Sequence, residues 1–325
     1  MAGFIIQRLL QALGVMLAMS VIVFVGVYAI GNPIDVLIPP EASQDLRERT
    51  IERFGLDLPL YEQYLVFLGN LLKGDFGRSF VYNMPVLELI LSRLPATAEL
   101  AIGAVLLAAL VGVPLGMYAG YRPDGTPARA IMTLSILGFS VPTFWVGLIL
   151  ILIFAVSLGW LPAGGRGETV ELVGAQWSFV TANGLSHLLL PTVNLSLFTL
   201  AMMIRLARAG TREVMLTDTV KFARAAGLSE PTIALRHVLK LISIPIVTVF
   251  GLELGTTLAF AVVTETIFSW PGAGKLIIDS ITSLDRPVMV AYLILIAFLF
   301  VTINLVVDVV YALLDPRLRR GATTR

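Results

Sequence analysis

The sequence contains no cysteine, only two histidines and few charged side chains. Without cysteine there are no disulfides and no thiolate metal sites, and His187 and His237 lie far apart in the sequence, so we expect no metal cluster built by this chain alone. Aspartate, glutamate, lysine and arginine make up 14% of the 325 residues, whereas 57% are hydrophobic. These proportions exclude an ordinary soluble domain and are typical of an integral membrane protein.

The sequence also lacks the short motifs of common catalytic sites. It has no GxSxG, no HExxH and no cluster of carboxylates. The nearest approach to a Walker A loop is "PGAGKL" at 271–276, but Ser269 stands where the first glycine belongs and Leu276 stands where a serine or threonine is needed. We therefore expect a chain that is not an enzyme and binds no cofactor of its own.

Six long apolar runs account for most of what is present. Each is near or above the roughly 20 residues that a helix needs to cross the hydrocarbon of a membrane. They lie at about 9–30, 97–119, 130–158, 185–204, 241–266 and 288–313. The first run follows a single charge at Arg8 and has no convincing cleavage site, so it is interpreted as a retained signal anchor. The sequence predicts an all-α integral membrane protein with six transmembrane helices, forming a single domain over residues 1–325.

Lysine and arginine gather on one side of these predicted spans. Positive side chains resist translocation, so we expect that side to be cytoplasmic, with both termini on it. It holds fourteen of the twenty-three basic residues, namely Arg8, Arg122, Arg129, Arg205, Arg208, Arg212, Lys221, Arg224, Arg236, Lys240, Arg317, Arg319, Arg320 and Arg325. The other side holds nine, and six of these lie in the segment 31–97.

The segment 31–97 is too long for a bare loop and is predicted to form small helices outside the membrane. Capping and helix-starting residues give their expected boundaries as Ser43 to near Gly55, Pro59 to Gly74, and a third start at Pro85. Two interpretations of this extracytoplasmic insertion stay open. It is either a lid that shields helix ends or a docking surface for an external partner.

The stretch "KFARAAGLSEPTIALRHVLK" at 221–240 joins the fourth and fifth apolar runs. We expect the fourth helix to continue to about Ala226, Gly227 to end it in the left-handed conformation, and Ser229 to cap a second helix. The expected apolar face comprises Leu216, Val220, Phe222 and Ala223, flanked by the charges of Lys221 and Arg224. This cytoplasmic elbow suits anionic lipid headgroups or a socket on another protein, and both readings stay open.

Four polar residues within or beside the predicted spans are candidates for a structural or a transport role. Glu253 lies near the middle of the fifth span, where an ionisable side chain is costly and faces a protein interior or a watery path. It is either a structural hydrogen-bonding group or a carboxylate on the path of a solute that carries an ammonium group. The other candidates for intramembrane polar contacts or the solute path are Glu265, Asn304 and Asp308. Asn304 and Asp308 are one helical turn apart, which favours an interhelical hydrogen-bonding pair over a transport site.

Small and aromatic residues add two structural expectations. Gly112, Gly116 and Gly120 recur at every fourth position, a spacing typical of close helix packing. Trp160 and Trp270 stand at the predicted outer ends of spans, where we expect them to belong to an aromatic belt at the membrane surface.

The elbow resembles a specific motif, carried by "FARAAGL" followed by "RHVL". It is similar to the cytoplasmic coupling motif, or EAA loop, of permease subunits of binding-protein-dependent ABC importers, in the variant of the dipeptide, oligopeptide and nickel subfamily. The resemblance extends over nearly the whole chain, in the order of the family. The other matching stretches are "GLDLPLYEQYLVFLGNLLKGDFGRSF" at 55–80, "PVLELILSRLPATAEL" at 85–100, "SVPTFWVGLILILIFAVSLGWLPAGG" at 140–165, "VTETIFSWPGAGKL" at 263–276 and "NLVVDVVYALLDPRLR" at 304–319.

This resemblance implies a multi-pass permease in the inner or plasma membrane of a prokaryote. The implied partners are a homologous second permease, two cytoplasmic ATPases that bind ATP and magnesium, and an extracytoplasmic solute-binding protein. The implied coupling loop is 206–240, and its implied ATPase-coupling residues are Lys221, Phe222, Ala223, Arg224, Ala225, Ala226, Gly227 and Leu228. Lys221 stands where the wider family has a glutamate, and Lys240 stands where a proline is common, so an ion pair made by that glutamate is not carried over.

The expected solute is a di- or oligopeptide, with nickel, glutathione and oligosaccharides as alternatives. A secondary transporter is expected to show repeat symmetry and interrupted helices in corresponding halves. A channel is expected to show a filter-like loop or a ring-forming charge. Neither pattern is evident in the sequence, so an ATP-driven importer is the favoured prediction.

Overall fold

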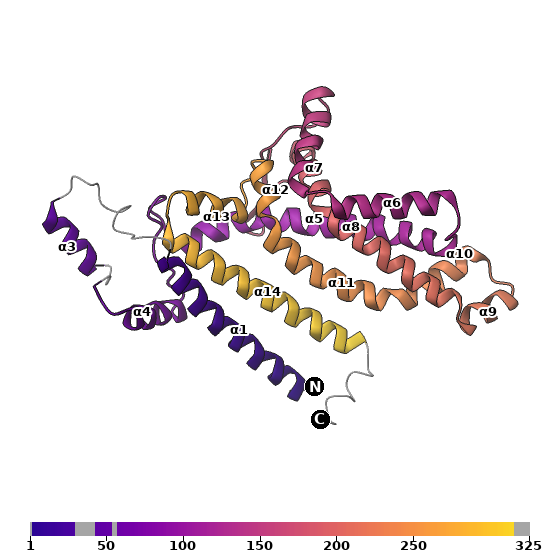
Figure 1. Cartoon of the computed structure of the whole chain (residues 1–325), viewed down its shortest axis with the longest axis horizontal. Helices are drawn as coiled ribbons and strands as arrows, with labels where there is room; N and C mark the ends of the chain where they lie inside the picture. The colour runs from indigo at the N-terminus through magenta and orange to yellow at the C-terminus, as the bar shows by residue number, and fades with distance from the viewer. Residues whose placement is uncertain (1, 30–42, 54–56, 315–325) are drawn as a thin grey trace. The chain divides into compact units, whose positions relative to one another are not determined.

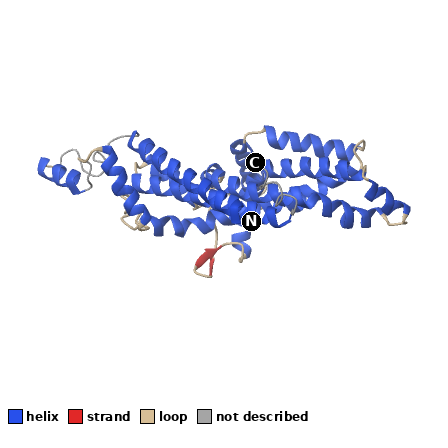
Figure 2. Cartoon of the chain, turned by 90° about the horizontal axis from the view of Figure 1, so that it is seen from below, coloured by secondary structure: helices blue, strands red, loops and turns tan. Residues whose placement is uncertain are grey.

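The computed structural model of the chain describes residues 2–29, 43–53 and 57–314. Helices make up most of the described part (Figure 2), which confirms the predicted helical class. The helices are α1 Ala2–Ala29, α3 Gln44–Arg53, α4 Leu60–Leu72, α5 Val86–Tyr121, α6 Thr126–Ser140, α7 Thr143–Leu150, α8 Ala182–Met215, α9 Asp218–Ala225, α10 Glu230–Ile233, α11 Leu239–Phe260, α12 Val262–Ile267, α13 Ala273–Thr282 and α14 Arg286–Leu314. Two π-helical stretches are η1 Ile151–Ser157 and η2 Ala234–Val238, and strands β1 Val170–Leu172 and β2 Ala175–Trp177 form an antiparallel pair.

Five helices are long and apolar enough to cross a membrane, and a bent pair brings the number to six if it counts as one crossing. The five lie within Ile6–Gly26, Val86–Tyr121, Ala182–Met215, Glu230–Phe260 and Arg286–Val309, and the bent pair joins Thr126–Ser140 to Thr143–Ser157. These ranges overlap all six predicted apolar runs. The described residues therefore support a helical membrane protein with five or six crossings.

The third predicted span is not one straight helix, because the direction of the helix changes by 107° between its two halves. The break lies at Val141 and Pro142. Proline has no amide hydrogen to continue a helix and pushes the residue before it into an extended conformation. Val141 has that conformation, with φ −87° and ψ 133°. In Figure 1, α7 turns away from α6 at this point.

Three other predicted helix boundaries are wrong. The fourth helix does not run on to Ala226, since α8 ends at Met215 and α9 begins separately at Asp218. The fifth predicted run is divided, because α11 ends at Phe260 and α12 follows as a short helix of its own. The third small helix of the insertion, expected to begin at Pro85, is instead the beginning of the long helix α5.

One compact unit comprises Met1–Leu94 and Gly272–Val301. In it, α4 packs against α1, where the rings of Phe24 and Tyr64 lie 5.3 Å apart and the Ser20 and Tyr64 hydroxyls are 2.8 Å apart. Within the insertion, α3 follows Ser43 and α4 follows Pro59 as predicted, and Gly74 closes α4 with a φ of +77°. The predicted end of the first small helix near Gly55 lies outside the described residues.

A buried aspartate ties the insertion to the beginning of α14 within the same unit. The Asp285 carboxylate accepts hydrogen bonds from the Ser79 hydroxyl and from the backbone amides of Phe80 and Val81, the latter two at 3.2 Å. Asp285 is fully buried. Three donors on one buried carboxylate hold the segment before α5 in a fixed place.

The second compact unit comprises Pro95–Pro271 and Thr302–Arg325, of which the described part ends at Leu314. Here α5 and α8 approach closely along the repeated glycines. A Cβ on Gly112 would lie 2.9 Å from the Cβ of Met203, one on Gly120 would lie 2.7 Å from the Cβ of Thr211, and one on Gly116 would overlap the backbone of α8. These contacts confirm the predicted role of the glycines in helix packing. The arginines after Leu314 lie outside the described residues.

The aromatic-belt prediction is wrong for Trp270. This side chain is completely buried, and its indole nitrogen donates a hydrogen bond of 2.9 Å to the carbonyl of Ala96. It packs with Leu100 and Leu188 in a core cluster of the second unit. Trp160 is exposed, so its belt role stays a prediction.

Candidate functional site

The predicted elbow consists of α9, α10 and η2, which connect α8 to α11 at one end of these helices (Figure 1). Its inward side chains are completely or almost completely buried, namely Val220, Ala223, Ile233 and Val238. They share one hydrophobic cluster with Met203 and Ala207 of α8 and with Ile242 of α11. Both arms of the elbow are therefore anchored on the helices that they join.

The turn between the two arms forms as the sequence predicts. Gly227 has a φ of +79°, which is the left-handed region. The amide of Leu228 donates to the carbonyl of Ala223 at 3.1 Å, and the amide of Gly227 donates to the carbonyl of Arg224 at 2.9 Å. This pair of hydrogen bonds is the Schellman motif, which ends a helix with a glycine.

Ser229 begins the second arm, but not in the predicted manner. It occupies the N-cap position of α10 with an extended backbone, at φ −68° and ψ 149°. Its hydroxyl lies 2.8 Å from the hydroxyl of Thr232 and makes no capping hydrogen bond to the helix. The predicted side-chain cap is therefore wrong, although the predicted helix start is right.

The predicted apolar face of the elbow divides into two sides. Val220 and Ala223 point into the protein, whereas Leu216 and Phe222 are 77% and 76% exposed. Leu235 of η2 is also exposed. Large apolar side chains left outside a well-packed base form a surface suited to contact with another molecule.

Four charged residues of the elbow form two ion pairs. Lys221 Nζ lies 2.9 Å from Asp218 Oδ1 within α9. Arg224 Nε and Nη2 donate to Glu230 Oε1 and Oε2 at 2.7 and 3.2 Å across the turn. The hydrogen bond to Glu230 raises the pKa of Arg224, so the guanidinium stays charged. The sequence analysis did not single out Glu230 as a partner of Arg224, although an opposite charge six residues further on, beyond a glycine turn, was a usable signal.

The structure assigns different threonine partners to the two intramembrane glutamates. Glu253 of α11 accepts a hydrogen bond of 3.1 Å from Thr199 of α8. Glu265 of α12 is completely buried and accepts one of 2.6 Å from Thr97 of α5. Each carboxylate therefore links two helices of the second unit. Whether either also lies on a solute path stays a prediction.

Asn304 and Asp308 lie one turn apart on α14, as expected. Asn304 Oδ1 is buried and has no hydrogen-bond partner among the described residues. The backbone of α11 approaches α14 closely here, because a Cβ on Gly251 would overlap the side chain of Val307. The interhelical pair of Asn304 and Asp308 stays a prediction.

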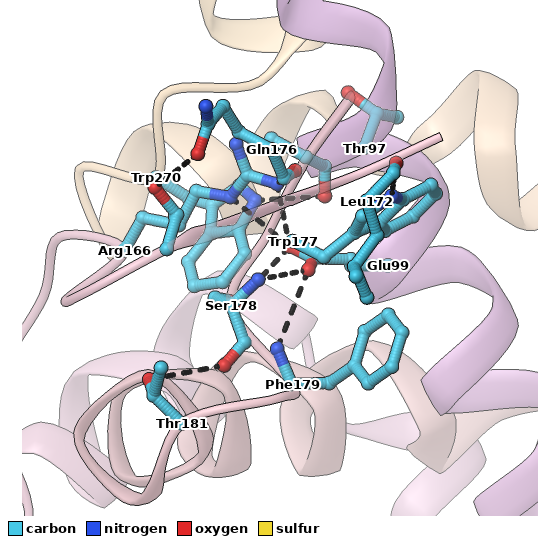
Figure 3. Close-up of polar contacts among 12 residues, drawn as sticks. Thr97, Glu99, Arg166, Leu172, Gln176, Trp177, Ser178, Phe179, Thr181 and Trp270 are labelled. Carbon is cyan, nitrogen blue, oxygen red and sulfur yellow. Dashed lines mark hydrogen bonds and ion pairs between the residues drawn. The ribbon is translucent and has the colours of Figure 1, made fainter. Parts of the chain in front are cut away.

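A second polar cluster, absent from the sequence predictions, surrounds Glu99 of α5 (Figure 3). Its carboxylate accepts hydrogen bonds from Arg166 Nε at 3.0 Å, from the Ser178 hydroxyl at 2.9 Å, and from the backbone amides of Ser178 and Phe179. Arg166 Nη2 completes an ion pair with the same carboxylate at 2.9 Å. Arg166 also donates to the carbonyl of Gln176, so the cluster holds the segment that carries β1 and β2. Because donors of this chain occupy the carboxylate, Glu99 is an anchor for this segment. An acidic residue inside the apolar run that begins at 97 was the overlooked signal.

Among the described residues, no group of three or more histidine, cysteine, aspartate or glutamate side chains is placed to hold a metal ion. The side chains of the elbow offer apolar contact, ion pairing and hydrogen bonding. The elbow is the candidate site, since it combines a rigid base with an exposed apolar surface.

Comparison with solved structures shows the fold. One similar structure is that of the inward-facing MetNI methionine ABC transporter, with a TM-score of 0.55 and 16% sequence identity. The match covers 70% of this chain and 97% of that chain.

Comparison of sequences shows the family. Residues 112–320 match the family described as binding-protein-dependent transport system inner membrane component, and residues 1–101 match its N-terminal part. The oligopeptide transport system permease protein AppB of Bacillus subtilis and the di/tripeptide transport system permease protein DppB of Pseudomonas aeruginosa are each 38% identical to this chain. The glutathione transport system permease protein GsiC of Escherichia coli is 37% identical. Each comparison covers 98% of this chain and 99% of the relative, and the chain therefore belongs to the family of binding-protein-dependent transport system inner membrane components.

Proposed function

We propose that the protein is the permease subunit of an ABC importer that carries di- or oligopeptides across the membrane into the cytoplasm. The names of three relatives, for oligopeptides, di- and tripeptides and glutathione, support a solute with peptide bonds. In this proposal a solute-binding protein delivers the peptide from outside, and a homologous second permease completes the path. Two ATPase subunits bind ATP and magnesium and carry out the hydrolysis.

The elbow is the proposed contact with the ATPases. Phe222 and Leu216 project from it and would enter a groove of an ATPase subunit, while Val220 and Ile233 hold its base in the core shared with α8 and α11. A displacement of the ATPase surface would move α9 and carry the two long helices with it, because close-packed cores transmit small shifts as rigid movements. The proposed coupling residues are those from Lys221 to Leu228, and the proposed coupling loop is 206–240.

The charges of the elbow favour a protein socket over lipid headgroups. Binding to anionic headgroups depends on an excess of positive charge on the polar face of a helix. Here Lys221 is paired with Asp218 and Arg224 is paired with Glu230, so these four residues carry no net charge, and the exposed Arg236 leaves the elbow with one excess positive charge. The exposed apolar side chains are then the main attraction, as in the core of a protein interface.

The orientation that this function requires agrees with the distribution of basic residues. The elbow would be cytoplasmic, together with both termini, and the insertion 31–97 would be extracytoplasmic. The insertion would then lie on the side from which a binding protein delivers the solute. Its two interpretations, lid and docking surface, remain separate proposals.

Replacement of Phe222 by alanine tests the proposed contact. This side chain is 76% exposed, so its removal should leave folding nearly unchanged, within about 0.5 kcal/mol. We expect Phe222→Ala to weaken co-purification of the ATPase subunits and to lower peptide uptake. Leu72→Ala is the matched control, because Leu72 is 82% exposed but lies at the end of α4, in the other compact unit of the chain. Equal ATPase recovery from both variants would contradict the proposal.

A further inference from the structure

We propose that Glu230 is a positioning residue for coupling, which acts with Arg224 as a clamp that fixes the angle between the two arms of the elbow. This inference rests on the proposed coupling function and adds a residue outside the stretch from Lys221 to Leu228. The clamp joins the last turn of α9 to the first turn of α10, with Gly227 between them.

The geometry of the pair restricts orientation as well as distance. Two nitrogens of Arg224 reach two different oxygens of Glu230, at 2.7 and 3.2 Å. A planar guanidinium that meets a carboxylate through two parallel hydrogen bonds fixes the relative orientation of the two groups. A lysine or a single hydrogen bond would leave that orientation free.

The turn has few other restraints. No atom lies within 4 Å of the position that a Cβ would take on Gly227, so no side chain packs against the turn there. The Ser229 hydroxyl makes no capping hydrogen bond that would hold the beginning of α10. Val220 and Ile233 anchor the two arms at their inner faces. Among the described residues, the tip between them is held by the backbone hydrogen bonds of the turn, the contact of the Ser229 and Thr232 hydroxyls and the Arg224–Glu230 pair.

The exposure of the Arg224 and Glu230 side chains indicates that the pair orients the elbow and contributes little to folding. The side chains of Arg224 and Glu230 are 44% and 52% exposed, and exposed ion pairs contribute little to stability. Loss of the clamp should therefore leave the protein folded and inserted while the angle between the arms becomes variable. A lever with a variable angle would absorb part of the ATPase movement before it reaches α11.

The first test measures the elbow without any ATPase. The chain has no cysteine, so spin labels can be attached at Thr219→Cys in α9 and Leu235→Cys in η2 of the full-length protein, and their distance distribution can be recorded. We expect a narrow distribution in the parent protein, a broad one in Glu230→Gln, and a narrow one again in the exchanged pair Arg224→Glu with Glu230→Arg. Asp218→Asn is the matched control, since it breaks an exposed ion pair within α9 that does not bridge the turn. An unchanged distribution in Glu230→Gln would overturn the clamp.

The second test measures coupling in the complete transporter in proteoliposomes. We expect Glu230→Gln to retain its ATPase subunits and an unchanged thermal unfolding temperature but to import less peptide per ATP hydrolysed, with recovery in the exchanged pair. ATPase loss in Glu230→Gln without recovery in the exchanged pair would overturn the clamp, because Glu230 would then contact the ATPase directly. A different result would contradict the proposed coupling function itself, namely full recovery of the ATPase subunits with Phe222→Ala.

Discussion

At the residue scale, the number of donors around each carboxylate separates anchors from candidates for transport. Glu99 accepts hydrogen bonds from Arg166, Ser178 and Phe179, and removal of one partner from such a buried ion pair is expected to cost about 3–5 kcal/mol. Glu253 accepts one from Thr199 and is only partly buried. Glu253 is therefore the carboxylate for which a role in the solute path needs a direct test.

Replacement of Glu253 by glutamine separates a structural role from a role in the solute path. Glutamine keeps an acceptor for the Thr199 hydroxyl but carries no charge. The hydrogen bond from Thr199 favours the structural role. We therefore expect the Glu253→Gln variant to assemble and to transport peptide nearly normally. Glu253→Leu would leave the Thr199 hydroxyl without its partner, at a cost of about 1–3 kcal/mol in the free energy of unfolding. Uptake of a peptide and thermal unfolding in detergent measure the two effects.

The control for this prediction is a peptide whose amino group is blocked. If Glu253 lines the path of an ammonium group, Glu253→Gln loses uptake of the free peptide and keeps uptake of the N-acetylated one. Equal uptake of both peptides by a well-assembled Gln variant supports the structural role. Selective loss of the free peptide contradicts it.

At the element scale, turns were predictable from the sequence, whereas continuity of helices was not. The left-handed stop at Gly227 is a local property of glycine, and it was predicted correctly. Proline did not predict helix ends in the same way. Pro142 breaks the third predicted span, but prolines also lie inside continuous helices at Pro95 and Pro114 of α5, Pro191 of α8 and Pro245 of α11. Proline therefore occurs both at a break and inside continuous helices of this chain, so its presence alone does not predict where a helix ends.

The same limit applies to the candidate site. Helical periodicity grouped Val220, Phe222 and Ala223, but only contacts with α8 show that Phe222 is the exposed one. The Arg224–Glu230 pair depends on the path of the chain through the turn. The local motif was therefore predictable, while its inward and outward faces required the folded core.

Replacement of Gly227 by valine tests the elbow as an element. A β-branched residue at a φ of +79° is strained by about 1–3 kcal/mol, although no neighbouring atom obstructs the side chain. We expect Gly227→Val to weaken ATPase attachment and to lower uptake, while the membrane helices remain inserted. Co-purification of the ATPase subunits and uptake in proteoliposomes measure this.

Gly74→Val is the matched control for this prediction. Gly74 ends α4 with a φ of +77° and also has open space around its Cβ position. The two valines therefore introduce the same local strain at different places. Loss of ATPase attachment in both variants would show a general effect of strain and would contradict the specific role of the elbow.

At the scale of the whole molecule, the distribution of basic residues predicts how the chain is oriented in the membrane, and the proposed function requires the same orientation. The stretch 205–240, from the end of α8 through the elbow to the beginning of α11, carries seven basic and three acidic residues, whereas the nine acidic residues of the insertion 31–97 outnumber its six basic ones. An importer that uses cytoplasmic ATP needs its ATPase contact on the basic side. The elbow and the insertion should therefore be accessible from opposite sides of the membrane.

Single cysteines test this orientation. Ser43 and Ser229 are both exposed, and the chain has no cysteine of its own. With an impermeant thiol reagent added to intact cells, we expect labelling of Ser43→Cys and protection of Ser229→Cys. Permeabilised cells provide the control, since both cysteines should then react. Labelling of Ser229→Cys alone in intact cells would show that the orientation is inverted.

Dependence of transport on the ATPase partners is the central claim, and reconstitution tests it most directly. The measurement compares peptide uptake into proteoliposomes that contain the permease subunits alone with uptake into those that also contain the ATPase subunits, with binding protein and peptide outside and ATP and magnesium inside. We predict uptake only in the complete assembly, and its loss when a non-hydrolysable ATP analogue replaces ATP. Uptake of peptide by the permease subunits without ATPases, driven by an ion gradient or by the peptide gradient alone, would contradict the account.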